Sequence, residues 1–257
     1  MKHLIVFWVT MLFLVGCVNT VRVGELQNDK KSLPLGSAEQ VDIEITMGAG
    51  MLNVAGGAGA DLLNASLWYN VAEWQPIITY DELGSAGRLE LRQPDIVGAN
   101  WGSNTRYEWN LLFNDDVPTN LHARLGAGKS GFALWMMNLN RLTIEAGAGE
   151  TVVAIPGGQV RDLEIAMGVG KLTLDVSGDW DHDLDGRIRG GLGELIVKLP
   201  TETNVAVRVD GGLGEVQSHG LTLSGDTYSR NVGSDHTVTL DISGGVGSIR
   251  LELQEGQ

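Results

Sequence analysis

The sequence contains one cysteine, Cys17, and only six prolines among 257 residues. A single cysteine cannot form a disulfide within the chain, and a structural metal site built on several thiolates is not expected. Basic residues are also scarce, since 18 Lys and Arg stand against 32 Asp and Glu, for a net charge of −14. Nucleic-acid binding needs clustered Lys and Arg, so the composition argues against it.

Glycine is abundant instead, with 36 residues, about twice the usual share. Because proline is rare, this excess indicates many tight backbone positions in a folded protein, and not a linker or collagen. Apolar residues make up 43% of the chain and charged residues 19%. That balance supports a sizeable core, whereas disordered chains have the opposite balance.

The sequence has no apolar run long enough to span a membrane as a helix, which takes about 20 residues. Its main apolar stretch, residues 4–15, follows Lys2 and His3 and has the length of a signal-peptide core. The next residues, Leu14-Val15-Gly16-Cys17, resemble the bacterial lipobox. We therefore predict a lipoprotein signal peptide over residues 1–16, an acylated Cys17 that anchors the chain to the membrane, and a tether over residues 17–40.

This anchor predicts an extracytoplasmic protein held at the bacterial membrane surface. Val18 follows the cysteine, and it is not the Asp that retains many lipoproteins at the inner membrane. Where the host has an outer membrane, we expect that membrane to carry the protein.

A Gly-x-Gly motif between short alternating apolar segments occurs seven times. From Gly126 onward, the first glycines of successive pairs are separated by 21, 21, 23, 21 and 33 residues. This spacing indicates a structural repeat. The predicted corner glycines are Gly48 and Gly50, Gly126 and Gly128, Gly147 and Gly149, Gly168 and Gly170, Gly191 and Gly193, Gly212 and Gly214, and Gly245 and Gly247.

The segments around the glycines alternate with a period of two, as in Leu163, Ile165 and Met167, which is typical of β-strands. We predict an all-β protein, a β-solenoid-like stack of short strands with about 21 residues per coil. The glycines supply corners that need a positive φ or stacking without side chains. One solenoid over residues 41–257 is expected, irregular and aromatic-rich over 41–120 and regular over 121–253.

The strings ITMGAGMLNV, WYNVAEWQPIITY, GRLELRQP, LTIEAGAGETVVAIPG, IRGGLGELIVKLP and VRVDGGLGEV together resemble the toast-rack domain proteins of bacterial envelopes. The resemblance covers roughly residues 40–253. It implies an all-β solenoid-like domain without an established enzymatic activity or agreed catalytic residues. Relatives that carry membrane-spanning segments take part in envelope-stress signalling, and this chain lacks such segments.

A loose phosphate-loop pattern occurs at Gly126-Ala-Gly128-Lys129-Ser130. Phosphate binding by such a loop requires a helix to start directly after it, but an apolar strand pattern follows here. The motif is therefore interpreted as a solenoid corner, and we expect neither a nucleotide nor another cofactor.

Alternating aspartates precede Gly186, at Asp181, Asp183 and Asp185. This order resembles the start of a calcium loop, in which carboxylates surround the ion. Leu192 occupies the position of the usual closing Glu, and Arg187 and Arg189 add positive charge. A solvated acidic turn is favoured, and a calcium site is the alternative.

Catalytic signatures are absent from the sequence, which has neither a Gly-x-Ser-x-Gly elbow nor a His-Glu-x-x-His motif. We therefore expect a non-catalytic envelope interaction or scaffold module that binds an envelope protein or a glycan, with a link to the envelope-stress response. The alternative is a carbohydrate- or peptidoglycan-binding lipoprotein, and the third interpretation is a β-helix glycan hydrolase. A glycan would stack on the aromatic residues of the N-terminal part, Trp68, Tyr69, Trp74, Trp101 and Trp109.

Overall fold

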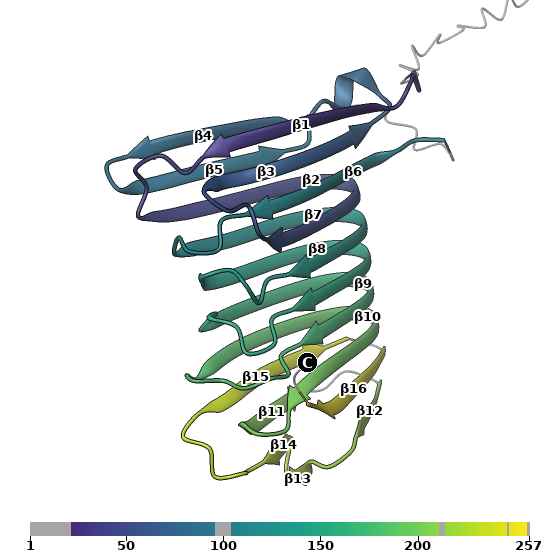
Figure 1. Ribbon diagram of the computed structural model, residues 1–257. Coiled ribbons are helices and arrows are strands. Elements are labelled where there is room, and N and C mark those ends of the chain that lie inside the picture. The colour runs from purple at the N-terminus through teal and green to yellow at the C-terminus, as the bar shows by residue number, and fades with distance from the viewer. Residues whose placement is uncertain (1–21, 96–103, 211–213, 246, 256–257) are drawn as a thin grey trace, which may run out of the picture.

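A computed structural model describes residues 22–95, 104–210, 214–245 and 247–255. Within these ranges sixteen strands form one sheet, wound into an elongated stack (Figure 1), and a short 3-10 helix spans Ala72–Trp74. The strands are β1 (Gln27–Pro34), β2 (Gln40–Gly56), β3 (Asp61–Tyr69), β4 (Ile77–Leu83), β5 (Ala86–Arg92), β6 (Tyr107–Phe113), β7 (Thr119–Ala133), β8 (Leu139–Ala154), β9 (Asp162–Asp175), β10 (Leu184–Pro200), β11 (Asn204–Asp210), β12 (Gly214–Ser218), β13 (Thr222–Ser224), β14 (Thr227–Arg230), β15 (Thr237–Gly244) and β16 (Gly247–Gln254). The predicted all-β, solenoid-like fold is confirmed.

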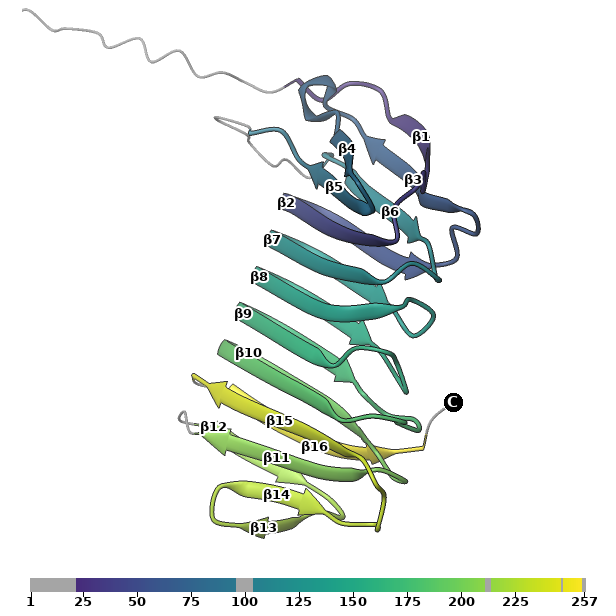
Figure 2. The ribbon, with the colours of Figure 1, turned by 90° about the vertical axis from the view of Figure 1, so that its left-hand side faces the viewer.

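Each regular coil consists of one long bent strand and a loop. The strands β2, β7, β8, β9 and β10 pair in parallel, each with the next, and lie one above another in the side view (Figure 2). The sequence predicts two or three short strands per coil, but backbone pairing continues through the Gly-x-Gly. The glycines therefore bend a strand between two faces of the stack without ending it. We call the face formed by the residues before the glycines the first face, and the face formed by the residues after them the second face.

The glycines form two columns because neighbouring coils approach too closely there for a side chain. A Cβ added to Gly168 would lie 2.3 Å from the Gly147 carbonyl oxygen, and one added to Gly191 would lie 1.9 Å from that of Gly168. In the second column the same overlap is combined with a positive φ, as at Gly170 with a φ of 135°. Both reasons expected from the sequence therefore apply, but to different glycines. Close stacking applies to both columns, and the positive φ applies to the second column from Gly50 to Gly193.

The core fills the space between the two faces. Leu142 and Ile144 on the first face and Val153 on the second are fully buried, whereas alternating residues such as Glu145 and Val152 are exposed. Loop residues such as Leu134 and Trp180 are buried as well and close the third side of the stack. Burying such a row of side chains stabilises a coil only when its neighbours cover it.

At the N-terminal end an interrupted coil replaces the regular one. The strand β5 pairs with the first half of β2, and β6 pairs with its second half. Between them, the side chain of Gln93 takes the place of a corner, because its Oε1 accepts hydrogen bonds from the amides of Gly48 and Ala49 at 2.7 and 3.0 Å. Antiparallel strands then cover this coil, with β4 beside β5, β3 beside β6, and β1 beside β3.

Part of the predicted tether, residues 17–40, is a strand of the folded stack. Residues 27–34 form β1, paired with β3 along their length, and so belong to the folded body. The sequence pattern did not reveal this strand because β1 is an edge strand whose residues are mostly exposed, so it shows little apolar alternation.

At the C-terminal end the order of the coils departs from the order of the sequence. The strands β15 and β16 pair with β10 on one side, and with β11 and β12 on the other. The chain thus leaves β10, forms the outermost coil and the β13–β14 hairpin, and returns into the gap. The glycine columns follow the spatial order, since Gly247 contacts Gly193, and Gly214 contacts Gly247.

Two adjacent glycines of β10 test the column. Gly191→Ala should lower the free energy of unfolding by about 3 kcal/mol, the upper end of the usual cost of overpacking, because a backbone carbonyl blocks the new methyl group. Gly190→Ala is the matched control, because its Cβ would meet nothing within 4 Å. Denaturant titration of both variants checks this expectation, and equal midpoints would contradict the column.

Candidate binding surface

Charged side chains form ladders on the first face of the stack. In-register parallel pairing places equivalent outward positions of successive coils side by side, so side chains interact across coils. Glu44 lies between Arg88, at 3.3 Å, and Arg124, and Arg124 also approaches Glu145, at 3.9 Å. Each such exposed pair contributes only about 0.2–1 kcal/mol. The ladder therefore contributes a fixed pattern of charge more than it contributes stability.

A groove with a volume of about 890 Å³ runs along this face beside the first glycine column. Its floor is low because glycines and Ala166 lack long side chains, whereas Arg124, Glu145 and Arg189 rise beside it. Arg189 is paired with Glu164 at 2.7 Å. The lining residues are Thr46, Met47, Gly48, Arg124, Leu125, Gly126, Thr143, Glu145, Ala146, Gly147, Glu164, Ala166, Met167, Gly168, Arg189, Gly190 and Gly191.

The chemistry of this groove suits binding. Guanidinium and carboxylate groups alternate along an exposed, extended surface, and they offer hydrogen-bond donors and acceptors at regular intervals. Groups that already pair with each other exchange partners at modest cost, which fits a contact with another polar surface. The groove extends over the five strands β2, β7, β8, β9 and β10 and is therefore the candidate functional site.

Most aromatic residues of the predicted glycan-binding site lie in the core and not on the surface. Tyr69, Trp74 and Trp109 are buried, and Tyr107 lies between the two indoles, with ring centroids 5.8 Å from Trp74 and 5.6 Å from Trp109. Rings inside the core cannot stack on a sugar, so the glycan platform is wrong for these three residues. Trp68 is half-buried, and Trp101 lies outside the described residues.

The hydroxyl of Tyr69 reaches the surface of this cluster. It donates a hydrogen bond to Asp29 Oδ2 of β1 at 2.8 Å. Burial, together with this carboxylate, raises the pKa of Tyr69 to about 12. The bond thus fastens the edge strand to the core.

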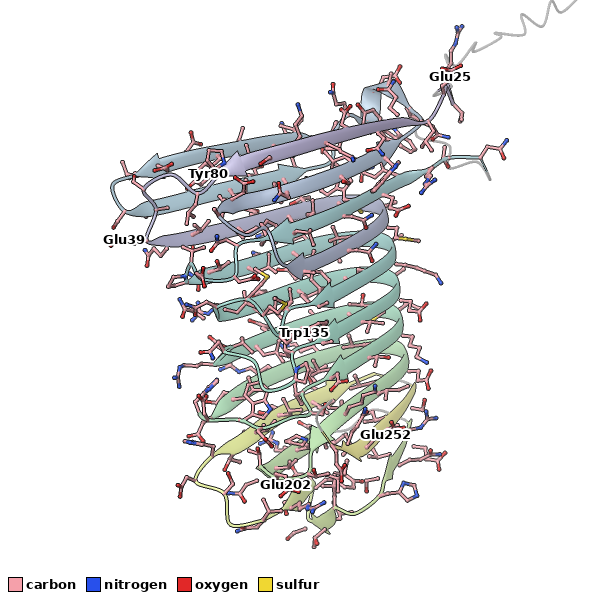
Figure 3. All side chains as sticks on the ribbon, viewed as in Figure 1. Glu25, Glu39, Tyr80, Trp135, Glu202 and Glu252 are labelled. Carbon is pink, nitrogen blue, oxygen red and sulfur yellow. The ribbon has the colours of Figure 1, made fainter. Side chains whose placement is uncertain are left out.

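The exposed aromatic residue is elsewhere. Trp135 is 51% exposed, next to the exposed Met136, in the loop after β7. Figure 3 shows Trp135 where the second halves of the strands end, away from the glycine bends. The sequence alone does not distinguish Trp135 from the buried tryptophans, because Trp135 lies in a loop whose path only the fold defines.

The three aspartates of the predicted calcium loop do not converge. Asp181 Oδ1 lies 2.7 Å from His182 Nδ1, whereas Asp183 Oδ1 accepts a hydrogen bond from the amide of Thr237 at 2.9 Å. Asp185 lies within β10, beside Thr239 of β15. Throughout the described ranges, no group of three His, Cys, Asp or Glu side chains is placed to hold a metal ion. In this geometry the three carboxylates do not share one site.

His182 instead closes the loop side of its coil. Its ring is buried, packs edge-on against Trp180 at 5.5 Å, and places Nε2 3.1 Å from the carbonyl of Val160. The hydrogen bond from His182 lowers the pKa of Asp181. The acidic turn therefore carries one specific polar contact between neighbouring loops.

The phosphate-loop pattern is structural. The Gly126–Ser130 pattern lies inside the continuous strand β7, where Lys129 pairs with Glu150 at 3.2 Å, so no helix begins there. Cys17 lies outside the described residues.

The family model for the N-terminal domain of toast_rack, DUF2154, matches residues 22–160. The chain belongs to the toast-rack family. A protein from Clostridium sporogenes, provisionally named as a cell adhesion protein, shares its fold with a TM-score of 0.65 and 28% identity, over 90% of this chain and 100% of the other. One from Bacteroides fragilis, provisionally named as an adhesin, has a TM-score of 0.31 and 9% identity, over 90% and 99% of the two chains, and supports no functional argument.

No curated protein matches this toast-rack chain. Its described residues also include no helix that is long and apolar enough to cross a membrane.

The Asp181–His182 contact predicts a pH dependence. The pKa of Asp181 is lowered in the folded state, so its contribution to stability is complete above the ordinary carboxyl pKa of about 3.9. It is lost as the pH falls through the lowered value, because the carboxylate must then bind a proton. Asp181→Asn should therefore melt below the wild type at pH 6, and the two melting temperatures should converge once the pH is below the lowered pKa of Asp181.

The exposed neighbour Asp179 supplies the control variant, Asp179→Asn, which should follow the wild type over the same pH range. A gap between Asp181→Asn and the wild type that is constant with pH would show that the contact does not depend on the carboxylate charge.

Proposed function

We propose that this toast-rack chain is a lipid-anchored, non-catalytic interaction or scaffold module of the bacterial cell envelope. The groove on the first face is its contact surface, and another envelope macromolecule is its partner. A contribution to the envelope-stress response through that partner belongs to the same proposal.

The observation that carries this proposal is the rigid charge ladder beside the groove. The Arg and Glu side chains are held at the strand spacing of about 4.8 Å, which provides a pre-organised surface at little entropic cost on binding. The similarity to the Clostridium sporogenes protein covers 90% of this chain, and the name of that protein refers to adhesion. Both support a module that works by contact.

The anchor would orient the stack. The strands β1, β3 and β4 cover the N-terminal end of the stack, and we call them the N-terminal cap. The described chain begins beside this cap, and the outermost coil with β13 lies at the opposite end (Figure 1). A lipid on Cys17 would hold the capped end near the membrane and direct the coils away from it. The net charge of −14 would add repulsion from anionic headgroups.

The lipid anchor is tested by Cys17→Ser. We expect this variant either to remain unprocessed or to leave the membrane fraction, because the lipobox cysteine is the acylation site. Membrane fractionation after a high-salt wash, with metabolic labelling by a fatty acid, measures both outcomes. Unchanged labelling and sedimentation of the variant would contradict the anchor.

The contact surface is tested by reversing charges in the groove. The double variant Arg124→Glu and Arg189→Glu should bind isolated bacterial envelope fractions about tenfold more weakly, a loss of about 1.4 kcal/mol, while its melting temperature changes little. The matched control is Lys129→Glu with Lys171→Glu, because both lysines form ion pairs on the second face. Equal losses in the two double variants would indicate a net-charge effect and remove the groove from the proposal.

A further inference from the structure

The strands β15 and β16 occupy a slot that the rest of the chain forms. They lie between β10 and the outermost coil (Figure 2), although β11 to β14 come first in the sequence. Among the described residues, they connect to the other strands through one linker, residues 231–236. The slot is therefore a binding site for an extended strand, filled from the same chain.

On the first face, an arginine flanks the slot on each side at one position of the inserted strand. Arg187 of β10 and Arg208 of β11 each align with Asp241 of β15, and Arg208 Nε lies 3.4 Å from Asp241 Oδ1. Without β15, the two arginines would become direct cross-strand neighbours, which is destabilising for like charges. The slot thus selects a strand with a carboxylate at this position.

The second face carries the opposite charge. Glu194 of β10 and Glu215 of β12 both align with Ser248 of β16, and Arg250 of β16 lies 3.6 Å from Glu194. Closing the gap would bring the two glutamates together. Like charges at these positions therefore oppose direct stacking of the outermost coil on β10, even though the 21-residue step from Gly191 to Gly212 suits it. One pair of opposite charge, Arg189 and Asp210, which both align with Ser243, would offset part of this repulsion.

The core makes an empty slot unfavourable. Val238, Leu240, Ile242 and Leu251 are at most 1% exposed, so loss of the strand would expose their apolar neighbours in β10 and β11. A strand that fills the slot must then carry both this apolar row and the charges described above. Within the sequence, residues 237–254 meet these requirements, and a second copy of the chain supplies them equally well.

Packing around the strand is looser than in the regular coils. A cavity of about 90 Å³, lined by Ile188, Gly190, Val209, Ile242, Gly244 and Ile249 among others, lies along the slot. It exists because glycine occupies positions 190 and 244, whereas the equivalent position in β9 is Met167. Unfilled space lowers the stability of the strand in the slot.

The linker is held by only a few polar contacts. Asn204 accepts a hydrogen bond from the amide of Val232 at 3.0 Å and donates one to the carbonyl of Ser234 at 2.7 Å. Asp183 holds the amide of Thr237. These contacts involve exposed or half-buried residues, so the linker can open without unfolding the coils.

We propose that the slot also accepts β15–β16 from a second copy of this chain, so that two copies exchange their C-terminal strands. Exchange keeps every contact of the slot and changes only the path of the linker, which is how identical elements are swapped at low cost. The partner is thus a second copy, recognised by its charge pattern.

Cysteine pairing between two variants tests the exchange. On a Cys17→Ser background, one chain carries Asp185→Cys and the other Thr239→Cys, two outward positions that face each other across β10 and β15. The variants are mixed, unfolded, refolded together at high concentration and oxidised. We expect a disulfide-linked dimer in the mixture, and none when either variant is refolded alone.

The matched control is a pair of single variants, Arg141→Cys and Asp162→Cys, which face each other across β8 and β9 in the same outward row. Those strands lie inside the regular stack and are not exchanged, so their mixture should remain monomeric. If the slot mixture gives no more linked dimer than this control, the proposal is overturned.

Deleting residues 232–236 provides a second measurement. The linker crosses two strand spacings, about 10 Å, and the one residue left would reach only about 7 Å. The strand then cannot enter its own slot, and light scattering should give twice the chain mass of 27.5 kDa. A deletion variant that stays monomeric counts against the exchange.

Discussion

Adjacent coils of this protein meet backbone against backbone at the glycine columns, where a carbonyl oxygen lies 1.7–2.7 Å from where a Cβ would stand. This contact lets a parallel strand turn from one face to the other without losing its pairing. It also fixes the register, since a shift by one residue would place a side chain against a carbonyl. The apolar rows inside the stack and the charged rows outside both depend on that register.

The ends of the stack show how the constraint is satisfied where repetition stops. At the N-terminal end, the amide oxygen of Gln93 replaces the missing carbonyl column, and antiparallel strands cover the interrupted coil. At the C-terminal end, β15 and β16 lie next to β10, and β11 and β12, which precede them in the sequence, form the outermost coil. There Arg187 and Arg208 lie on either side of Asp241, in the strand between them. Side chains thus specify the ends, and glycine specifies the middle.

Much of the fold was predictable from the sequence because both signals behind it are local. The spacing of the glycines indicates the coils, and the alternation around Leu163, Ile165 and Met167 indicates strands. The order of the last coils was not predictable, because the 21-residue step to Gly212 equals the regular step. The insertion of β15 between β10 and β11 depends on contacts between residues that are distant in the sequence. The burial of Trp74 and Trp109 depends on long-range packing in the N-terminal cap. The groove was likewise missed, since it forms only when outward positions of several coils align.

The most direct test of the account measures which glycines touch across coils. In a sample with selectively labelled glycine, nuclear Overhauser contacts between Hα protons should connect Gly193 with Gly247 and Gly247 with Gly214, in the spatial order of the column. Cross-peaks should also connect Gly147 with Gly168 in the regular part. A direct contact between Gly193 and Gly214, with none to Gly247, would contradict the inserted strand and the register on which the structure depends.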